Sequence, residues 1–474
     1  MMARRVGKDG LVSNCGTIAS CLLVVFCAIV LLTGCGRSPA ANNLLDIAGD
    51  MNWNVRGVQQ APTETAWAYS WDQSYVNSIV GSSCTIVGNR VYQGGQGLLE
   101  LDLKTGKELL NTNWTKKNHM FLQGSPVVCQ GRVYGILSEQ KTTEMPGVGL
   151  LYQRLSCLDA ATGKILWQSD EIGTGEKPCG SQPLLLGGKI YLAACFPVPP
   201  SGKALETDVH AAVGIWDAAT GKLTGHISLP KGAFPGYTHL VSDGTFIYGN
   251  ACYEFAWSRC RSSLFRYDPA TAEMGWSISY PTTSKDFTNI YTALAVDSTT
   301  LVAVFQTEDQ PRGVINSVFT NGARRRVVAA FDTVTGHSLW TKTEEIPPTL
   351  LITQYPCVAL QQGVAFFTIH DGSLMAADEH TGAQRWSFVS GAADWCLDLI
   401  PMATRDVLYV REGLAYLVAL DPSTGVKLCQ KTLLTPEEWD SETKELCDII
   451  PVDKGLIVVT ANTSDLRPII ELWK

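Results

Sequence analysis

The chain has 474 residues, and its 45 Asp and Glu outnumber its 37 Lys and Arg, which gives a net charge of −8. An acidic protein is a poor candidate for nonspecific binding to nucleic acid or to an anionic membrane surface, so we expect no nucleic-acid partner. A chain of this length ordinarily predicts several domains, but internal repetition of the sequence overrides that expectation.

The first 35 residues have the pattern of a bacterial lipoprotein signal peptide. Arg4, Arg5 and Lys8 give a positive start, an apolar run covers residues 21–33, and the sequence Leu-Thr-Gly-Cys ends at Cys35. The apolar run is too short for a typical membrane-spanning helix. We expect cleavage before Cys35 and acylation of its thiol with palmitate-type chains; an ordinary signal peptide and an uncleaved anchor are the alternatives. Residues 36–61 are predicted to be a flexible tether.

Seven copies of one short motif recur along the rest of the chain. Each opens with Asp and carries Thr three residues later, and all but one carry Gly at the fourth place. The copies open at Asp102, Asp159, Asp217, Asp268, Asp332, Asp378 and Asp421. Ala272 replaces Gly in the fourth copy, and Trp stands eight residues after Asp at Trp167, Trp276, Trp340 and Trp386.

The motif predicts a β-hairpin. An apolar strand ends at Asp, whose carboxylate accepts backbone N–H groups of the turn, and Gly supplies the positive φ that the turn needs. The next strand carries Trp, whose large apolar area one hairpin cannot bury, so each unit requires a neighbour. The spacing of 43 to 64 residues between successive Asp residues is typical of the four-stranded blades of a β-propeller.

The two ends of the chain predict how the ring closes. Residues 448–452, 456–459 and 468–472 are three strand-like runs, one short of a complete blade. Residues 65–71, ahead of the first blade, are a further strand-like run that can complete it and remove two exposed sheet edges. The sequence therefore predicts an all-β, eight-bladed β-propeller over residues 62–474, closed by its N-terminal strand. Seven blades is the competing count.

Eleven cysteines follow Cys35, and disulfides can form in a bacterial envelope. Cys252 and Cys260 flank one hairpin, and Cys396 and Cys447 take similar places in adjacent blades, so both are candidate pairs. The alternative is that most of the cysteines are small buried hydrophobic residues of the blade strands.

The long insertions of the sequence fall mostly on one face of the predicted ring. In a four-stranded blade, the links between the second and third strands lie on the face opposite the Asp turns, and these links are enlarged in blades 2, 3, 4 and 5. We expect a protein partner to bind there, since enlarged apolar loops make a docking surface. The alternative is that the loops pack on one another. The candidate partner-binding residues are Met145, Leu150, Tyr152, Phe196, Phe255, Trp257, Val314 and Phe319.

Catalytic motifs are weak in this sequence. Its seven His residues are scattered, and the usual serine-hydrolase, zinc-protease and phosphate-binding signatures do not occur. The repeated Asp residues are interpreted as turn caps, and Arg324, Arg325 and Arg326 as a solvated loop end. We therefore predict no catalytic residue, no cofactor-binding residue and no metal site.

The repeat Ala/Leu-x-Asp-x-x-Thr-Gly-x-x-x-Trp resembles that of pyrroloquinoline-quinone (PQQ)-type propellers. The nearest matches run from Cys157 to Trp167 and from Gly372 to Trp386. Two branches share the repeat. The quinoprotein alcohol dehydrogenases are enzymes with a vicinal Cys-Cys pair beside the quinone, and no two cysteines are adjacent in this chain.

The other branch is the family of the outer-membrane assembly factor BamB, which the chain resembles more closely through its lipobox and length. The resemblance implies a non-enzymatic envelope lipoprotein, anchored in the outer membrane by its lipid and facing the periplasm. It also implies a periplasmic or outer-membrane protein partner, and points to the complex that assembles outer-membrane β-barrels. The alternative function is a PQQ- or calcium-dependent dehydrogenase with altered ligands, in which PQQ would be the cofactor.

Overall fold

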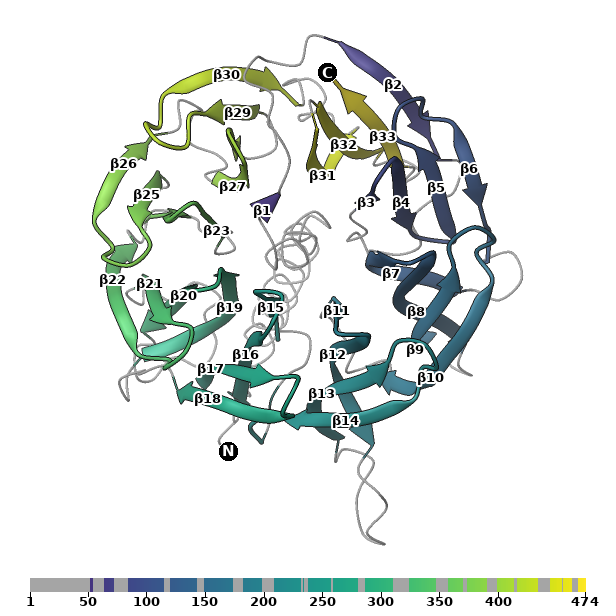
Figure 1. Ribbon diagram of the computed structural model, residues 1–474, viewed down its shortest axis with the longest axis horizontal. Coiled ribbons are helices and arrows are strands. Elements are labelled where there is room, and N and C mark those ends of the chain that lie inside the picture. Colours follow the sequence, from purple (N-terminus) through teal and green to yellow (C-terminus); the bar gives the residue numbers. More distant parts are fainter. Residues whose placement is uncertain are drawn as a thin grey trace, which may run out of the picture.

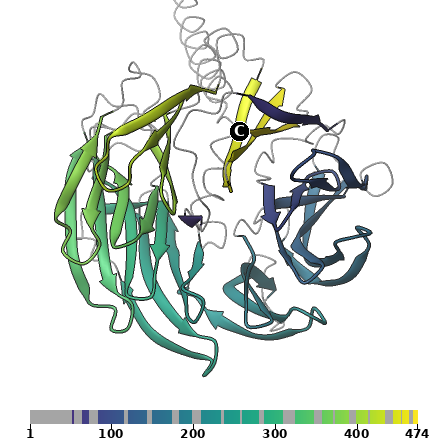
Figure 2. The ribbon, with the colours of Figure 1, turned by 45° about the horizontal axis from the view of Figure 1, so that its top comes forward.

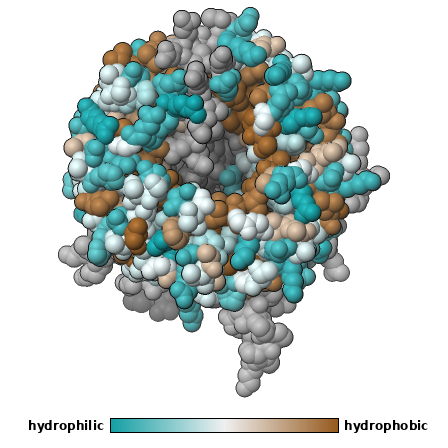
Figure 3. Space-filling model, viewed as in Figure 1, coloured by the Kyte–Doolittle hydropathy of each residue, from teal (hydrophilic) through white to brown (hydrophobic). Residues whose placement is uncertain are grey.

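Eight small antiparallel sheets form a ring in the computed structural model (Figure 1). The structure describes residues 52–53, 64–71, 84–114, 120–142, 149–173, 182–197, 209–231, 233, 238–256, 259–279, 286–309, 324–346, 357–369, 373–389, 399–412, 416–433, 444–453, 455–462 and 468–474. These residues contain strands and turns and no helix, and the tilted view of Figure 2 shows the sheets standing side by side in a ring. The space-filling view of Figure 3 shows the face seen in Figure 1 hollowed at the middle of the ring, which we call the central channel. The predicted eight-bladed β-propeller is confirmed.

Each blade has four strands, which run in chain order from the centre of the ring outward in blades 1 to 7. Blade 1 contains β3 (Cys84–Val87), β4 (Arg90–Gly94), β5 (Leu98–Asp102) and β6 (Glu108–Asn111). Blade 2 contains β7 (Met120–Cys129), β8 (Arg132–Thr142), β9 (Gly149–Asp159) and β10 (Ile165–Gly173). Blade 3 contains β11 (Leu184–Leu186), β12 (Lys189–Pro197), β13 (Val209–Asp217) and β14 (Leu223–Ser228). Blade 4 contains β15 (Leu240–Ser242), β16 (Ile247–Ala256), β17 (Arg259–Asp268) and β18 (Glu273–Ser279).

The second half of the ring repeats this order. Blade 5 contains β19 (Asp286–Val296), β20 (Thr300–Asp309), β21 (Arg324–Asp332) and β22 (Ser338–Ile346). Blade 6 contains β23 (Val358–Gln361), β24 (Val364–Thr368), β25 (Leu374–Asp378) and β26 (Gln384–Phe388). Blade 7 contains β27 (Leu399–Thr404), β28 (Leu408–Glu412), β29 (Tyr416–Leu420) and β30 (Lys427–Thr432), and β1 (Asn52–Trp53) joins its inner edge. Blade 8 contains β31 (Lys444–Val452), β32 (Gly455–Asn462), β33 (Pro468–Trp473) and, outermost, β2 (Thr65–Ser70).

The ring closes as the sequence predicts. β2 pairs antiparallel with β33, from Thr65 opposite Trp473 to Ser70 opposite Ile469. The Trp67 indole N–H donates to Leu103 O of blade 1 at 2.9 Å. The N-terminal strand thus completes the last blade and also contacts the first one, which removes the two free edges that an open ring would expose.

The ring has two faces, which we name by the connections they carry. The turn face carries the links between first and second strands and the Asp turns between third and fourth strands. The long-hairpin face carries the links between second and third strands. This assignment follows from the alternating strand directions within each antiparallel blade.

The Asp turns have the geometry that the motif predicts. In blade 2, Asp159 Oδ1 accepts the backbone N–H of Thr162 at 2.8 Å and its hydroxyl at 2.6 Å, and Gly163 has φ +65°. The threonine hydroxyl bond, followed by the amide bonds of the turn, holds the pKa of this carboxyl below its usual range. The same bonds recur at Asp102, Asp217, Asp332 and Asp378, so the repeated Asp residues are turn caps.

Each repeat Trp packs flat on the turn glycine of the following blade. A Cβ added at Gly382 would lie 2.8 Å from the Trp340 ring, and the Trp340 indole N–H donates to Glu379 O of the same turn at 2.7 Å. The same packing joins Trp67 to Gly106, Trp167 to Gly221, Trp276 to Gly336 and Trp386 to Gly425. The glycine therefore adopts the positive φ of the turn and also leaves room for the indole ring to approach the backbone.

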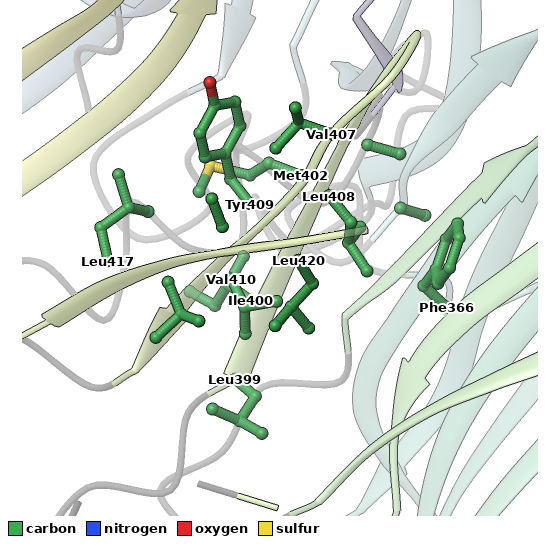
Figure 4. Packing of buried hydrophobic residues seen from close by; sticks show 14 of the residues in the cluster. Phe366, Leu399, Ile400, Met402, Val407, Leu408, Tyr409, Val410, Leu417 and Leu420 are labelled. Atoms are coloured by element: carbon green, nitrogen blue, oxygen red, sulfur yellow. The ribbon is translucent and has the colours of Figure 1, made fainter. Parts of the chain in front are cut away.

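The hydrophobic core lies between neighbouring blades and is divided among the seams of the ring. Its largest cluster joins blades 6, 7 and 8, and Figure 4 shows Phe366 of blade 6 beside side chains of blade 7, including Leu408 and Leu420. These three side chains are fully buried. Two-sided burial explains why the second and third strands are nearly continuous apolar runs rather than alternating ones.

Candidate functional site

The second strands of four adjacent blades extend well beyond those of blades 1, 6 and 7 on the long-hairpin face, and that of blade 8, β32, is intermediate with 8 residues. The second strands of blades 2, 3, 4 and 5 have 11, 9, 10 and 10 residues, whereas those of blades 1, 6 and 7 have 5 each. About four to six more residues at 3.3 Å per residue add roughly 13–20 Å to these hairpins. The described parts of these insertions are therefore continuations of the sheet, from Arg132 paired with Asp159 to Thr142 paired with Gly149 in blade 2.

Opposite charges meet across the extended part of blade 5. Thr307 of β20, Arg325 of β21 and Glu345 of β22 lie in one row, and Arg326 faces Glu344 in the next row. Opposite charges directly across a sheet stabilise the pairing by about 0.2–1 kcal/mol each. Because Thr288 of β19 also lies opposite Thr307, the blade 5 extension is a four-stranded sheet in which opposite charges lie across neighbouring strands.

A buried amide network holds the base of the blade 2 hairpin. Gln123 Oε1 of β7 accepts the Ser138 hydroxyl at 3.1 Å and the Gln153 side-chain amide at 2.5 Å. Ser138 and Gln153 are fully buried. Since burying unpaired polar groups costs on the order of 1–3 kcal/mol each, this network fixes the hairpin relative to the innermost strand.

Arg326 is buried, which corrects the interpretation of the three arginines as a solvated loop end. β21 begins at Arg324, and the Arg326 side chain is 1% exposed. Its Nη1 donates to Thr368 O at 3.1 Å and to Thr368 Oγ1 at 2.7 Å, across the seam from blade 5 to blade 6. The basic run looked like a loop because its neighbours in sequence are polar, while the residues that bury Arg326 belong to another blade.

The eight residues predicted to bind a partner are spread over described and undescribed parts of the chain. Met145, Trp257, Val314 and Phe319 lie outside the described residues, and the side chains of Leu150 in β9 and Phe255 in β16 are also outside them. Tyr152 lies in β9 and is half-buried. Phe196 lies in β12, and its ring stacks on Trp216 with centroids 6.0 Å apart, as part of the core cluster between blades 2 and 3. Phe196 therefore packs within the ring.

One of the candidate disulfide cysteines is in a disulfide bond. Cys252 of β16 is disulfide-bonded, and its partner lies outside the described side chains, as do the side chains of Cys260, Cys396 and Cys447. The pairing of Cys252 with Cys260 stays a prediction, and so does that of Cys396 with Cys447. Burial raises the pKa of the Cys157 thiol to about 11, so this cysteine is a buried small apolar residue rather than a nucleophile.

His239 has a structural place that the scattered pattern of histidines did not indicate. It stands just before β15 and is 8% exposed, with its backbone N–H donating to Asn250 Oδ1 at 2.8 Å. Burial lowers its pKa to about 4, so the ring is neutral at pH 7. The burial of His239 could not be predicted from the sequence, because no signal in the flanking residues accompanies it and the residues that bury it come from other strands.

A cluster of ionisable groups lies on the turn face at the seam between blades 5 and 6. Glu379 is 5% exposed, and its Oε1 lies 3.3 Å from His380 Nε2. Burial raises the pKa of Glu379 to about 7, and the carboxylates of Asp297 and Asp378 raise it further while Arg385 opposes them. The sequence analysis missed this cluster because Asp297 belongs to the blade 5 turn and comes together with Glu379 only in the folded ring.

The described residues offer no ready site for a metal ion. Within the ranges that the structure describes, no group of three or more His, Cys, Asp and Glu is arranged to hold one. In the same ranges, no helix is long and apolar enough to cross a bilayer.

The fold and the repeat define the class of this protein as a PQQ-like repeat β-propeller. Residues 262–451, which run from blade 4 to blade 8, match the family described as "Outer membrane protein assembly factor BamB". The chain as a whole resembles this family. A comparison with curated proteins found no match.

Solved structures with the same fold come from both branches of the repeat. BamB from Moraxella catarrhalis has 12% identity and a TM-score of 0.51, over 87% of this chain and 99% of that one. The quinohemoprotein alcohol dehydrogenase ADHIIG from Pseudomonas putida HK5 has 13% identity and a TM-score of 0.50, over 86% of this chain and 76% of that one. At such low identity these likenesses establish the fold alone.

Proposed function

We propose that the chain is a non-enzymatic, lipid-anchored envelope protein that binds a periplasmic or outer-membrane protein through its long-hairpin face. The most specific form of the proposal is a scaffold in the assembly of outer-membrane β-barrels. The observation that carries it is the extension of the second strands of four adjacent blades on one face, which builds a broad platform over half the ring. The match of residues 262–451 to the BamB family supports the same role.

The N-terminal sequence and the family resemblance support this location. The lipobox ending at Cys35 predicts a lipid anchor, and two or more acyl chains give stable membrane attachment. An anchored propeller with a binding face is suited to hold a membrane partner at high effective concentration. Mass spectrometry of the protein purified from envelopes tests this: a diacylglyceryl and acyl mass on Cys35 supports it, and an unmodified N-terminus contradicts it.

Shortened hairpins test the binding face. Residues 141–150 can be replaced by Asn-Gly, which joins the paired Gln140 and Leu151 through a two-residue turn. In blade 5, Asn-Gly can likewise join the paired residues 306 and 326. We expect both changes to weaken binding to the purified periplasmic domains of the barrel-assembly protein at least tenfold, measured by calorimetry, while the thermal transition is kept.

The matched control lies on the opposite face. Val334 and Val426 are 67% and 60% exposed on Asp turns, and replacing each with Ser should leave the affinity unchanged. Equal affinity of the shortened and full-length proteins would remove the long-hairpin face from the proposal. If the full-length protein shows no measurable affinity for these domains, the barrel-assembly protein is not its partner.

A quinone- or calcium-dependent dehydrogenase is the second candidate, because the fold is shared with a quinohemoprotein alcohol dehydrogenase. Titration of the purified protein with PQQ, with and without calcium, separates the two functions. Saturable quinone binding would support the dehydrogenase function. No binding at high micromolar quinone would count against it and favour the protein-binding scaffold.

A further inference from the structure

The innermost strand of blade 7 has an additional neighbour inside the ring. β1 (Asn52–Trp53) pairs with β27, with Asn52 opposite Ala403 and Trp53 opposite Thr404. Figure 1 places β1 toward the middle of the ring, on the channel side of β27. Of the eight sheets that the structure describes, this one has five strands and the others four. Two residues of the predicted flexible tether are therefore a strand, while the rest of residues 36–61 lie outside the described part of the chain.

The channel edge of an innermost strand is a place where backbone groups need partners. Such an edge presents N–H and C=O groups that only water or another strand can satisfy. A short extended segment satisfies them without requiring any particular side chain. β1 supplies this pairing to β27 from the chain's own N-terminal region.

The pairing is parallel, and this fixes the direction of the chain. β27 ends at the link from Thr404 to Val407, which belongs to the turn face, so β27 runs from the long-hairpin face to the turn face. β1 runs the same way. β2 then begins on the turn face, since Thr65 lies opposite Trp473 at the end of β33.

The length of the connection agrees with this path. Twelve peptide steps from Trp53 to Thr65 reach at most about 40 Å. The radial distance from the channel to an outer strand is about four strand spacings of 4.8 Å, or roughly 19 Å. The connection can therefore leave the channel at the turn face and reach β2 without passing through the ring again.

We propose that β1 occupies the central channel beside β27 as a built-in ligand and runs from the long-hairpin side toward the turn face. The N-terminal end of β1 then points to the long-hairpin side. If Cys35 is acylated, which rests on the proposed function, the 17 residues up to Asn52 span at most about 60 Å. Because the N-terminal end of β1 points to the long-hairpin side, we expect the long hairpins to lie nearer to the membrane than the turn face.

Photo-crosslinking in the full-length chain tests the position of β1 in the channel. With benzoylphenylalanine in place of Trp53, we expect crosslinks to peptides that contain β27 or the neighbouring β23. The same probe in place of Val426, which is 60% exposed on the turn face, is the control and should not reach β27. Crosslinks from position 53 that map only to the outside of the ring or to a second molecule would overturn the proposal.

Hydrogen exchange gives a second readout. In a chain that starts at residue 64, the amide of Ala403, which faces the channel rather than β28, should exchange at least tenfold faster than in the full chain, while those of β4 and β5 in blade 1 stay unchanged. Unchanged exchange at Ala403 counts against the pairing. A general rise across all blades signals loss of the fold, and the crosslinking result then decides.

The orientation on the membrane has its own test. Azidophenylalanine at position 105 on the turn face or 345 at the end of β22 can carry a donor dye, and both positions are exposed. On phosphatidylethanolamine–phosphatidylglycerol vesicles with acceptor lipid, energy transfer should be at least twofold higher from position 345. Higher transfer from position 105 overturns the direction proposed for β1. Failure of both dyes to transfer argues against the lipid anchor and leaves the crosslinking test of the channel standing.

Discussion

The seam between blades 5 and 6 differs from the seam between blades 3 and 4 at two positions that face each other. One is the Trp position of the first blade, and the other is the turn-glycine position of the second. At the first seam, Trp340 packs on Gly382, whose φ is +68°. At the second seam, Gly225 stands where the Trp would be, and Ala272 takes the turn position with φ +60°. The turn itself is intact there, since Ala272 N–H donates to Asp268 O at 2.9 Å.

This comparison separates two demands on the turn glycine. Ala272 shows that the positive φ alone can be met by a residue with a Cβ, at a cost of about 1 kcal/mol. Glycine is required where a neighbouring side chain lies against the turn, which is an indole at five turns and Thr112 at Gly163. Blades 3 and 4 pack instead through Tyr191 and Tyr267, whose rings meet edge to face with centroids 6.2 Å apart.

Removing the indole should have the largest effect. Trp340→Ala loses the ring's burial on Gly382 and its bond to Glu379 O, and we expect the free energy of unfolding to fall by about 3–5 kcal/mol. Urea unfolding followed by circular dichroism measures it. Leu166→Ala, on an outer strand and 50% exposed, is the control and should change stability by less than about 1 kcal/mol. A loss at Trp340 no larger than this control would contradict the packing argument.

Adding a Cβ to the docked glycine should have the next largest effect. In Gly382→Ala the new Cβ meets the Trp340 ring at 2.8 Å, and we expect a loss of about 2–4 kcal/mol from overpacking and positive-φ strain. In the Trp340→Ala background the same change should cost only about 1 kcal/mol, because the strain alone remains. A double-mutant cycle measures this coupling. Additive losses would show that the indole does not set the demand for glycine.

The free energy of unfolding should depend on pH through Glu379, which lies at the same seam. Its pKa rises from the ordinary value to about 7 in the folded protein, so the folded state holds the proton more tightly than the unfolded one. Stability contributed by the neutral carboxyl is therefore full at acidic pH and is lost as the pH rises from about 4.5 through 7. We expect Glu379→Gln to match the wild type near pH 4.5 and to exceed it by roughly 2–3 kcal/mol at pH 8.

Unfolding titrations at several pH values measure that difference. Glu273→Gln replaces an exposed carboxyl on β18 and is the control, whose stability should stay within about 0.5 kcal/mol of the wild type. A Glu379→Gln curve parallel to the wild-type curve between pH 5 and 8 would mean that Glu379 is not held neutral by burial at the seam.

The smallest effect is expected at the undocked turn. Ala272→Gly relieves about 1 kcal/mol of positive-φ strain but adds about 0.4–1 kcal/mol of unfolded-state entropy. The net change should lie within about 0.5 kcal/mol of zero in thermal unfolding. A loss above about 1.5 kcal/mol would show that the Ala272 methyl contributes packing to this seam that the comparison leaves out.

Much of the fold could be predicted from the sequence because its signals are local. The Asp turns, the positive-φ position and the docking Trp all fall within nine consecutive residues, and seven copies specify the blades. The closing strand was predictable because an incomplete blade at one end matched a spare strand at the other, and β2 pairs with β33 accordingly. The enlarged blades were also predictable, but as loops rather than as continued strands.

The candidate site and the residues around it were harder to predict than the fold, because they depend on contacts that no local motif signals. The burial of Arg326 against Thr368 and the raised pKa of Glu379 each depend on residues from two blades, and the amide network at Gln123 joins three strands of blade 2 that no sequence motif links. The pairing of β1 with β27 joins residues about 350 positions apart and has no motif of its own.

The sequence by itself determined the repeating unit, the number of blades and the way the ring closes, because turn chemistry and hydrophobic patterning act over a few residues and repeat in phase. Only the tertiary structure decided which polar groups are buried at the seams and which strand enters the channel. These outcomes depend on the neighbours that the closed ring brings together, and backbone pairing and desolvation act on those neighbours whatever their distance along the chain.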